Sequence, residues 1–257
     1  MFPLSDDNPT LRIPVVTIAL LVLIGAVWIF VQGAGFDPGM LAASVCKLGL
    51  IPGEITRTAA VGTTVQIGDG MTCVVDSDPI NYLTPLTSMF LHGSWAHILG
   101  NGLFLWVFGN NVEDSMGRLR FIVFYLICGL VAAAAQVAIA PASPVPIVGA
   151  SGAISGVMGA YLVLYPTARV KTLFILIVFI RVIPLPAWAI LLYWFALQIL
   201  MALPQLTGAQ EAVSSGVAVL AHVGGFLTGA LLVKLFENRS LVDERTRRYG
   251  RMSAGGA

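Results

Sequence analysis

Residues 121–168 contain no Asp, Glu, Lys or Arg; they read FIVFYLICGLVAAAAQVAIAPASPVPIVGASGAISGVMGAYLVLYPTA. A second uncharged stretch covers residues 182–210. Only 11% of the 257 residues are charged and 57% are hydrophobic, whereas a soluble domain carries about 25% charged residues. So little charge cannot solvate the surface of a globular protein. The composition therefore excludes an ordinary soluble enzyme and predicts an integral membrane protein embedded in the lipid bilayer.

The net charge excludes a second class of protein. It is +1 at pH 7, and no basic stripe interrupts the apolar stretches. Proteins that bind nucleic acid need a basic patch or stripe, so we expect no nucleic-acid partner.

The apolar stretches divide into candidate membrane spans. A bilayer core of about 30 Å requires roughly 20 apolar residues in a helix. The first candidate is too long for a cleavable signal peptide, and Asp6 and Asp7 precede it. The six predicted spans are Ile13–Gln32, Thr87–Gly109, Leu119–Ala140, Ile147–Tyr165, Leu185–Leu203 and Gly216–Phe236. The sequence therefore predicts an all-α, polytopic bundle of six helices, with a long outer loop at about residues 33–86 between the first two. The apolar piece Thr172–Ile180 is too short to span, and we expect it at the interface or as an extension of the fifth helix.

The cationic residues predict the orientation. Six spans place both termini on one side, and of the 14 Lys and Arg residues only Lys47 and Arg57 fall on the opposite side. Cytoplasmic loops carry the excess of Lys and Arg, so we expect cytoplasmic termini. The chain then divides into a cytoplasmic segment 1–12, a six-helix domain 13–237 and a basic cytoplasmic tail 238–257. Spans two, four and six run inward from the outer face.

A few polar residues lie at the same depth in these three spans. The chain has three histidines; His97 shares a helix face with Asn101 in span two, and His222 lies near the start of span six. Ser151 lies near the start of span four. Polar residues inside a membrane are costly, so they are functional candidates by default. All of these residues are expected in the outer third of the bilayer.

Small residues can bring spans four and six together. Small residues four apart let membrane helices approach closely, and the two spans carry Gly152, Gly156, Ala221, Gly225 and Gly229. Ser151 and His222 lie beside these faces. Close packing would therefore bring the hydroxyl within hydrogen-bond reach of the imidazole, as an activated serine requires.

Plainer interpretations exist for each feature. Small-residue repeats usually serve only packing, a serine in a helix often bonds its own backbone, and a single histidine is more often structural than catalytic. Three histidines can also ligate a metal. However, zinc sites generally combine His with Cys or carboxylates at helical or short-loop spacing, and His92 and His97 are not on one helix face. Cys128 has no nearby Cys partner in sequence. We therefore expect no metal and no cofactor.

Three motifs together resemble those of the rhomboid intramembrane serine proteases. The run from His92 to Asn101, HGSWAHILGN, is similar to the HxxxxHxxxN signature of that family. Gly149-Ala-Ser-Gly152 resembles its GxSG nucleophile motif, and Ala221-His-Val-Gly-Gly225 its AHxxG motif. The motifs occur in the family's order on spans two, four and six, and the resemblance covers about residues 13 to 237.

The resemblance implies a role for each matching residue. Ser151 would be the nucleophile and His222 the general base and then the acid. The side chains of His97 and Asn101, with the backbone N–H of Ser151, would form the oxyanion hole. Supporting roles fall to His92, Gly149, Gly152 and Gly225.

The chain departs from the family in two places. Members often carry an aromatic residue four positions after the nucleophile, where it stacks on the base, and here that residue is Ser155. The orientation of His222 must then be held by other packing or by a hydrogen bond. The outer loop also contains Cys46 and Cys73, either disulfide-bonded or two unpaired thiols.

The acidic residues favour a Ser–His dyad over a triad. All of them fall in predicted loops and tails, and the nearest to His222 in sequence are Glu211 and Glu237. A carboxylate at the depth of His222 would be costly in hydrocarbon. No span supplies one.

The predicted function is that of an intramembrane serine endopeptidase. A serine site in the bilayer meets the transmembrane helices of other proteins first, and these expose their carbonyls only after local unwinding. The resemblance implies a multi-pass protein of a bacterial-type inner or plasma membrane, with its site open to the outer face. The alternative is a proteolytically inactive, rhomboid-like chaperone or quality-control binder, although such relatives lack the nucleophile or the base. A transporter is disfavoured because the chain shows no repeated halves.

Overall fold

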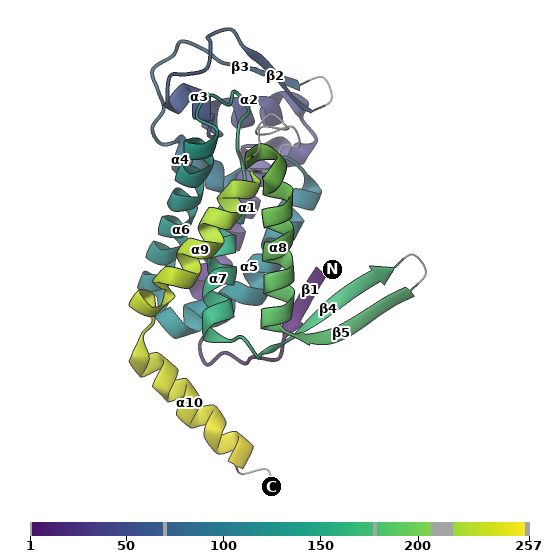
Figure 1. Ribbon diagram of the computed structural model, residues 1–257, viewed down its shortest axis with the longest axis vertical. Coiled ribbons are helices and arrows are strands. Elements are labelled where there is room, and N and C mark those ends of the chain that lie inside the picture. The colour runs from purple at the N-terminus through teal and green to yellow at the C-terminus, as the bar shows by residue number, and fades with distance from the viewer. Residues whose placement is uncertain (1, 69–70, 177–178, 207–217, 255–257) are drawn as a thin grey trace.

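The computed structural model describes the whole chain except residues 1, 69–70, 177–178, 207–217 and 255–257. The protein is mostly helical (Figure 1). The long helices are α1 Val15–Phe30, α5 Trp95–Met116, α6 Arg118–Ile139, α7 Ser151–Leu164, α8 Ala187–Leu206, α9 Val219–Phe236 and α10 Arg239–Ala254. The short helices are η1 Gly33–Gly35, α2 Pro38–Leu48, α3 Pro52–Ile55, α4 Thr84–Thr87 and η2 Ser88–Phe90. The strands are β1 Phe2–Asp6, β2 Thr64–Gly68, β3 Met71–Val74, β4 Arg169–Leu176 and β5 Phe179–Pro186.

Each predicted span contains one long helix, but two of the predicted boundaries are wrong. Helix α5 begins at Trp95 and continues past Gly109 to Met116, and α7 begins at Ser151 rather than Ile147. By length and composition alone, α6 and α9 qualify as membrane spans, and α1, α7 and α8 have shorter apolar stretches.

The protein is mostly helical, as predicted, but the described residues also include two small sheets that the prediction lacked. The piece Thr172–Ile180 belongs to strands β4 and β5, which pair antiparallel from Arg169–Pro186 to Leu176–Phe179. Strand β1 adds to β4, so the order is β1-β4-β5. The run is rich in Ile, Val and Phe, which favour strands. The prolines that follow it cannot sit in a helix interior.

Helices α7 and α9 pack with their backbones in contact, as the small residues predict. A Cβ atom on Gly225 would lie 2.0 Å from the carbonyl oxygen of Gly152, and one on Gly229 would lie 1.8 Å from that of Gly156. Any side chain at these positions would separate the two helices. Helix α6 packs against both of them.

Two acids lie in α5, where the sequence predicted a loop. Glu113 and Asp114 are both 3% exposed in its last turn. Glu113 accepts hydrogen bonds from the backbone N–H groups of Val16 (2.9 Å) and Thr17 (2.8 Å) at the start of α1. It therefore satisfies groups that the first turn of a helix leaves unpaired.

The outer segment 33–86 folds over one end of the bundle (Figure 1). It contains α2 and the β2–β3 hairpin, which a disulfide between Cys46 and Cys73 joins, with Cα atoms 5.4 Å apart. Of the two alternatives for these cysteines, the structure has the disulfide.

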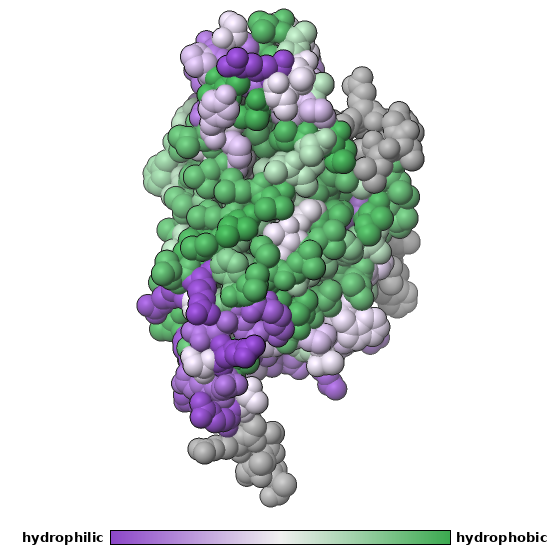
Figure 2. Space-filling model, turned by 60° about the vertical axis from the view of Figure 1, so that its left-hand side comes forward, coloured by the Kyte–Doolittle hydropathy of each residue, from purple (hydrophilic) through white to green (hydrophobic). Residues whose placement is uncertain are grey.

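The surface is apolar around the middle of the molecule. In Figure 2 a broad hydrophobic belt covers the helices, and hydrophilic residues gather at the two ends. Exposed side chains such as Val22 (65%), Phe30 (77%) and Leu231 (77%) contribute to the apolar surface. Such a belt suits contact with hydrocarbon rather than water.

Candidate active site

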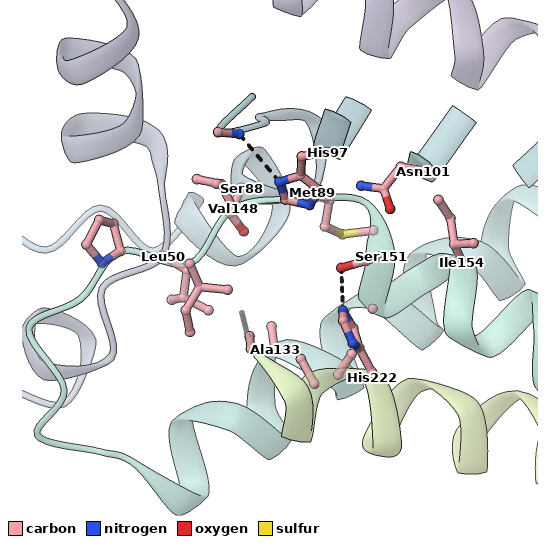
Figure 3. A pocket seen from close by; sticks show the side chains of 18 of the residues that line it. Leu50, Ser88, Met89, His97, Asn101, Ala133, Val148, Ser151, Ile154 and His222 are labelled. Carbon is pink, nitrogen blue, oxygen red and sulfur yellow. Dashed lines mark hydrogen bonds between the residues drawn. The ribbon is translucent and has the colours of Figure 1, made fainter. Parts of the chain in front are cut away.

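Three of the candidate residues lie in the first turns of three helices. His97 is the third residue of α5, which begins at Trp95, and Ser151 is the first residue of α7. His222 is the fourth residue of α9, which begins at Val219. The first turn of a helix leaves N–H groups unpaired and carries the positive end of the helix dipole. These three helix ends meet around one cavity (Figure 3), so the site favours negative charge.

Ser151 and His222 form a direct hydrogen bond. The Oγ of Ser151 lies 2.8 Å from the Nε2 of His222, as Figure 3 shows. Ser151 is the first residue of α7 rather than one turn into a helix, as its sequence position suggested. The glycine contacts between α7 and α9 bring the hydroxyl and the imidazole together.

Gly149 gives the nucleophile segment its shape. Its φ is +127°, a conformation that residues with a side chain rarely adopt. A Cβ atom here would also lie 2.7 Å from the Nε2 of His97. The glycine N–H donates to the carbonyl of Ser88 at 2.9 Å, which holds the segment before Ser151 in place.

His92 orients the amide of Asn101. His92 is fully buried, and its Nε2 lies 2.8 Å from the Nδ2 of Asn101. Because the amide nitrogen donates, one of its two N–H groups is used here and the second is available to the cavity, which Asn101 lines. The side chain of Gln32 holds His92 through two hydrogen bonds of 2.8 Å to its backbone.

His97 lies between Gly149 and His92. Its ring makes an edge contact with the ring of His92, with centroids 4.9 Å apart. The backbone N–H of Gly93 points at the Nδ1 of His97 from 3.5 Å. This arrangement leaves the Nε2 of His97 to carry the proton and to donate on the side of the cavity.

The cavity has a volume of about 760 Å³, within the range of ligand-binding pockets. Its lining includes Ser151, His222, His97 and Asn101. Residues of the β2–β3 hairpin, including Ile67 and Met71, form part of its lining.

Sequence analysis missed three residues of this neighbourhood: Gln32 behind His92, and Gln198 and Trp194 beside His222. The two glutamines are polar residues inside predicted apolar spans, and this signal could have marked them as candidates.

The acids and histidines do not form a metal site in the part of the chain that the structure describes. No three His, Cys, Asp or Glu side chains gather there closely enough to hold a metal ion. Glu237 lies just past the other end of α9 and bonds Lys234 at 2.7 Å. Glu211, the other acid near His222 in sequence, lies outside the described residues.

Comparison with known proteins identifies the family. The sequence model of the Rhomboid domain matches residues 81–239, more than half of the chain. The chain belongs to the rhomboid family. It is therefore an integral membrane protein, and every predicted site residue lies inside the matched range.

Similar proteins carry protease names. Rhomboid protease GluP of Bacillus subtilis is 43% identical over 77 residues, which cover 30% of this chain and 15% of that protein. Putative rhomboid protease YdcA of the same organism is 34% identical over 77 residues, 30% of this chain and 38% of that protein. Rhomboid-like protein 11, chloroplastic, of Arabidopsis thaliana is 37% identical over 71 residues, 28% of this chain and 25% of that protein. The matched segment thus spans less than half the length of each relative.

The rhomboid match leaves out the first 80 residues. These residues contribute Gln32, which holds His92, and the hairpin residues of the cavity lining. The site is therefore built from the rhomboid domain together with the segment that precedes it.

Proposed function

We propose that this rhomboid is an intramembrane serine endopeptidase with a Ser–His dyad. One observation carries the proposal: the Ser151 hydroxyl lies 2.8 Å from the His222 imidazole at the edge of a cavity large enough for a peptide segment. A nucleophile and a base within hydrogen-bond reach are the minimum for an activated serine.

In this mechanism Ser151 Oγ attacks the scissile carbonyl carbon while His222 Nε2 takes the hydroxyl proton. The imidazolium then gives the proton to the leaving amine as the C–N bond breaks. Water, deprotonated by His222, then attacks the acyl-enzyme; the ester C–O bond breaks, and the imidazolium returns the proton to Ser151 Oγ. The tetrahedral oxyanion would accept hydrogen bonds from the Ser151 N–H and from the side chains of His97 and Asn101.

The proposed substrates are transmembrane segments of other proteins. On the face shown in Figure 2 the helices are covered by apolar side chains, so we expect a substrate to reach the site from within the bilayer. A helix must unwind locally to offer a carbonyl, because its backbone bonds are internal. We therefore expect cleavage near helix-weakening residues, at a small residue.

The proposed topology has six spans, α1 and α5 to α9, with both termini cytoplasmic and the site near the outer face. In this arrangement residues 1–12 and 238–257 flank a membrane domain of residues 13–237. The positive-inside distribution of Lys and Arg supports it.

Cleavage of a model transmembrane substrate in liposomes tests the proposal. We expect the wild type to cut, and the Ser151→Ala and His222→Ala variants to lose activity. A fluorophosphonate probe should label the wild type and not Ser151→Ala. Ser155→Ala is the matched control, because this serine lies one turn further and donates to the Ser151 carbonyl instead (2.6 Å).

Two results would overturn the assignment. Labelling that persists in Ser151→Ala would identify another serine as the nucleophile. A wild type that binds transmembrane segments but neither cuts them nor reacts with the probe would support the alternative of an inactive, rhomboid-like chaperone or quality-control binder.

A further inference from the structure

His222 is held by two side chains of α8, a helix that carries none of the three motifs. The Oε1 of Gln198 lies 2.8 Å from the Nδ1 of His222. The ring of Trp194 lies against the imidazole, with centroids 5.8 Å apart and an interplanar angle of 39°. Residues four apart share a helix face, so one face of α8 contacts both the edge and the face of the imidazole.

The hydrogen bonds define the protonation of the imidazole. Ser151 can be activated only if its hydroxyl donates to Nε2, so Nε2 carries no hydrogen. The hydrogen of the neutral ring is then on Nδ1, and it is donated to the carbonyl oxygen of Gln198. Two hydrogen bonds, each of 2.8 Å, thus link Gln198 of α8 to His222 of α9 and His222 to Ser151 of α7.

The neighbouring residues keep Gln198 in place. Gln198 is only 8% exposed, so its side-chain carbonyl oxygen has little access to water. Phe195 stacks on Phe226 of α9 with ring centroids 4.5 Å apart. Phe226 lies one turn after His222, so this contact fixes α8 beside the imidazole.

Helix α7 does not supply this support. Ser155, four positions after the nucleophile, is too short to stack on the imidazole, and its hydroxyl donates to the carbonyl of Ser151. The acceptor at the Nδ1 of His222 is a neutral amide, the side chain of Gln198.

We propose that Gln198 is the positioning residue of the base: it selects the tautomer of His222 and aims Nε2 at Ser151, in the place where a triad has a carboxylate. The inference rests on the proposed protease function. It makes the site dependent on α8, because the base is oriented only while α8 is packed against α9.

Substitutions of Gln198 test this role through kinetics. Gln198→Leu keeps the bulk of the side chain and removes the acceptor, so kcat should fall by about tenfold or more while KM changes little. Gln198→Glu restores an acceptor and should recover activity. Its carboxylate also favours the imidazolium, so the acidic limb of the kcat/KM profile should move to higher pH by about one unit. Ile199→Ala, an exposed neighbour on α8 (42%), should behave as the wild type.

The tautomer gives a readout that does not need activity. The chain has three histidines, so ¹⁵N-histidine spectra in micelles can be assigned with His222→Ala. We expect the Nδ1–H form for His222 in the wild type and a mixture of tautomers in Gln198→Leu.

The results separate the two proposals. If the wild type neither cuts nor reacts with the fluorophosphonate, the protease function fails. If the wild type cuts, the positioning role is overturned by a Gln198→Leu variant with unchanged kcat and His222 tautomer, or by a Gln198→Glu profile that does not move. If Gln198→Leu does not fold, the Gln198→Glu profile and the wild-type spectrum still decide.

Discussion

At the scale of single residues, the site depends on neighbours that control which atom faces the cavity. His92 takes one N–H of Asn101 and so fixes the plane of the amide. Gly149 leaves the space that the His97 ring occupies. Neither residue needs to touch a substrate to influence the proposed oxyanion hole.

Asn101→Ala should therefore lower kcat by about 10²–10³-fold, as the loss of one oxyanion donor typically does, with little change in KM. His92→Leu leaves the amide in place but unsupported, and its effect should be smaller. Steady-state cleavage of the model substrate measures both. A rise in KM alone in Asn101→Ala would contradict the role.

Asp6 predicts a pH dependence of stability. Its carboxyl accepts hydrogen bonds from Asn111 Nδ2 (2.8 Å) and from the Tyr161 hydroxyl. Burial raises the pKa of Asp6 from 3.8 to about 6, although the Tyr161 bond opposes the shift. The folded protein then holds the proton more tightly than the unfolded chain. The stability contributed by Asp6 is thus complete below about pH 4 and is lost as the pH rises through about 6.

Asp6→Asn should consequently melt at a higher temperature than the wild type at about pH 7.5, and the advantage should shrink toward about pH 4. Thermal unfolding in detergent across this range is the measurement. The exposed Asp78→Asn variant should follow the wild type at every pH. A constant difference between Asp6→Asn and the wild type would refute the linkage.

At the scale of elements, helix ends are completed by side chains from other helices. Glu113, in the last turn of α5, accepts two backbone N–H groups of α1 and the hydroxyl of Thr17 (2.8 Å). Gln32, just past the end of α1, donates to the carbonyl of His92 and accepts from its backbone N–H, in the segment before α5. The two helices are thus joined at both ends.

Glu113→Ala should destabilise the protein by about 2–3 kcal/mol, because it leaves buried donors of α1 without an acceptor. Glu113→Gln, which keeps one acceptor oxygen, should recover part of the loss. Denaturant or thermal unfolding in micelles tests this, with the exposed Asp243→Ala as the control. Equal stability of Glu113→Ala and the wild type would show that water replaces the carboxylate.

At the scale of the whole molecule, the two ends carry different structural elements. One end carries the disulfide-linked outer segment and the candidate site, and the other carries the β1-β4-β5 sheet and α10 (Figure 1). The apolar belt lies between them. The proposed topology puts the disulfide end outside, where oxidising conditions preserve such bonds.

Cysteine labelling in intact cells tests this orientation. A membrane-impermeant maleimide should modify Val61→Cys, an exposed position (66%) of the outer segment. It should modify Ser240→Cys, in α10, only after permeabilisation. The reverse pattern would invert the topology, and labelling of both positions in intact cells would exclude the odd number of spans, α5 to α9, that the proposed topology places between them.

The residues that the motifs single out lie close together in the structure, although each motif is local to one helix, and their catalytic roles stay a prediction. Ser151, His222, His97 and Asn101 line one cavity, and His92 lies behind it, hydrogen-bonded to Asn101. The boundaries of α5 and α7 and the β4–β5 hairpin were mispredicted. The end of a helix depends on side chains from other segments, such as Glu113 at the start of α1. A strand depends on pairing with a distant segment, as β4 pairs with β1. A hydropathy pattern contains neither kind of information.

The sequence by itself determined the membrane class, the order of the long helices and the identity of the candidate nucleophile and base. These follow from the shortage of charge, since few polar residues remain inside the apolar stretches. Only the tertiary structure decided that Cys46 pairs with Cys73 and that Gln198 faces His222. Both pairs join segments far apart along the chain, and their contact depends on how the helices pack, which no local pattern of residues encodes.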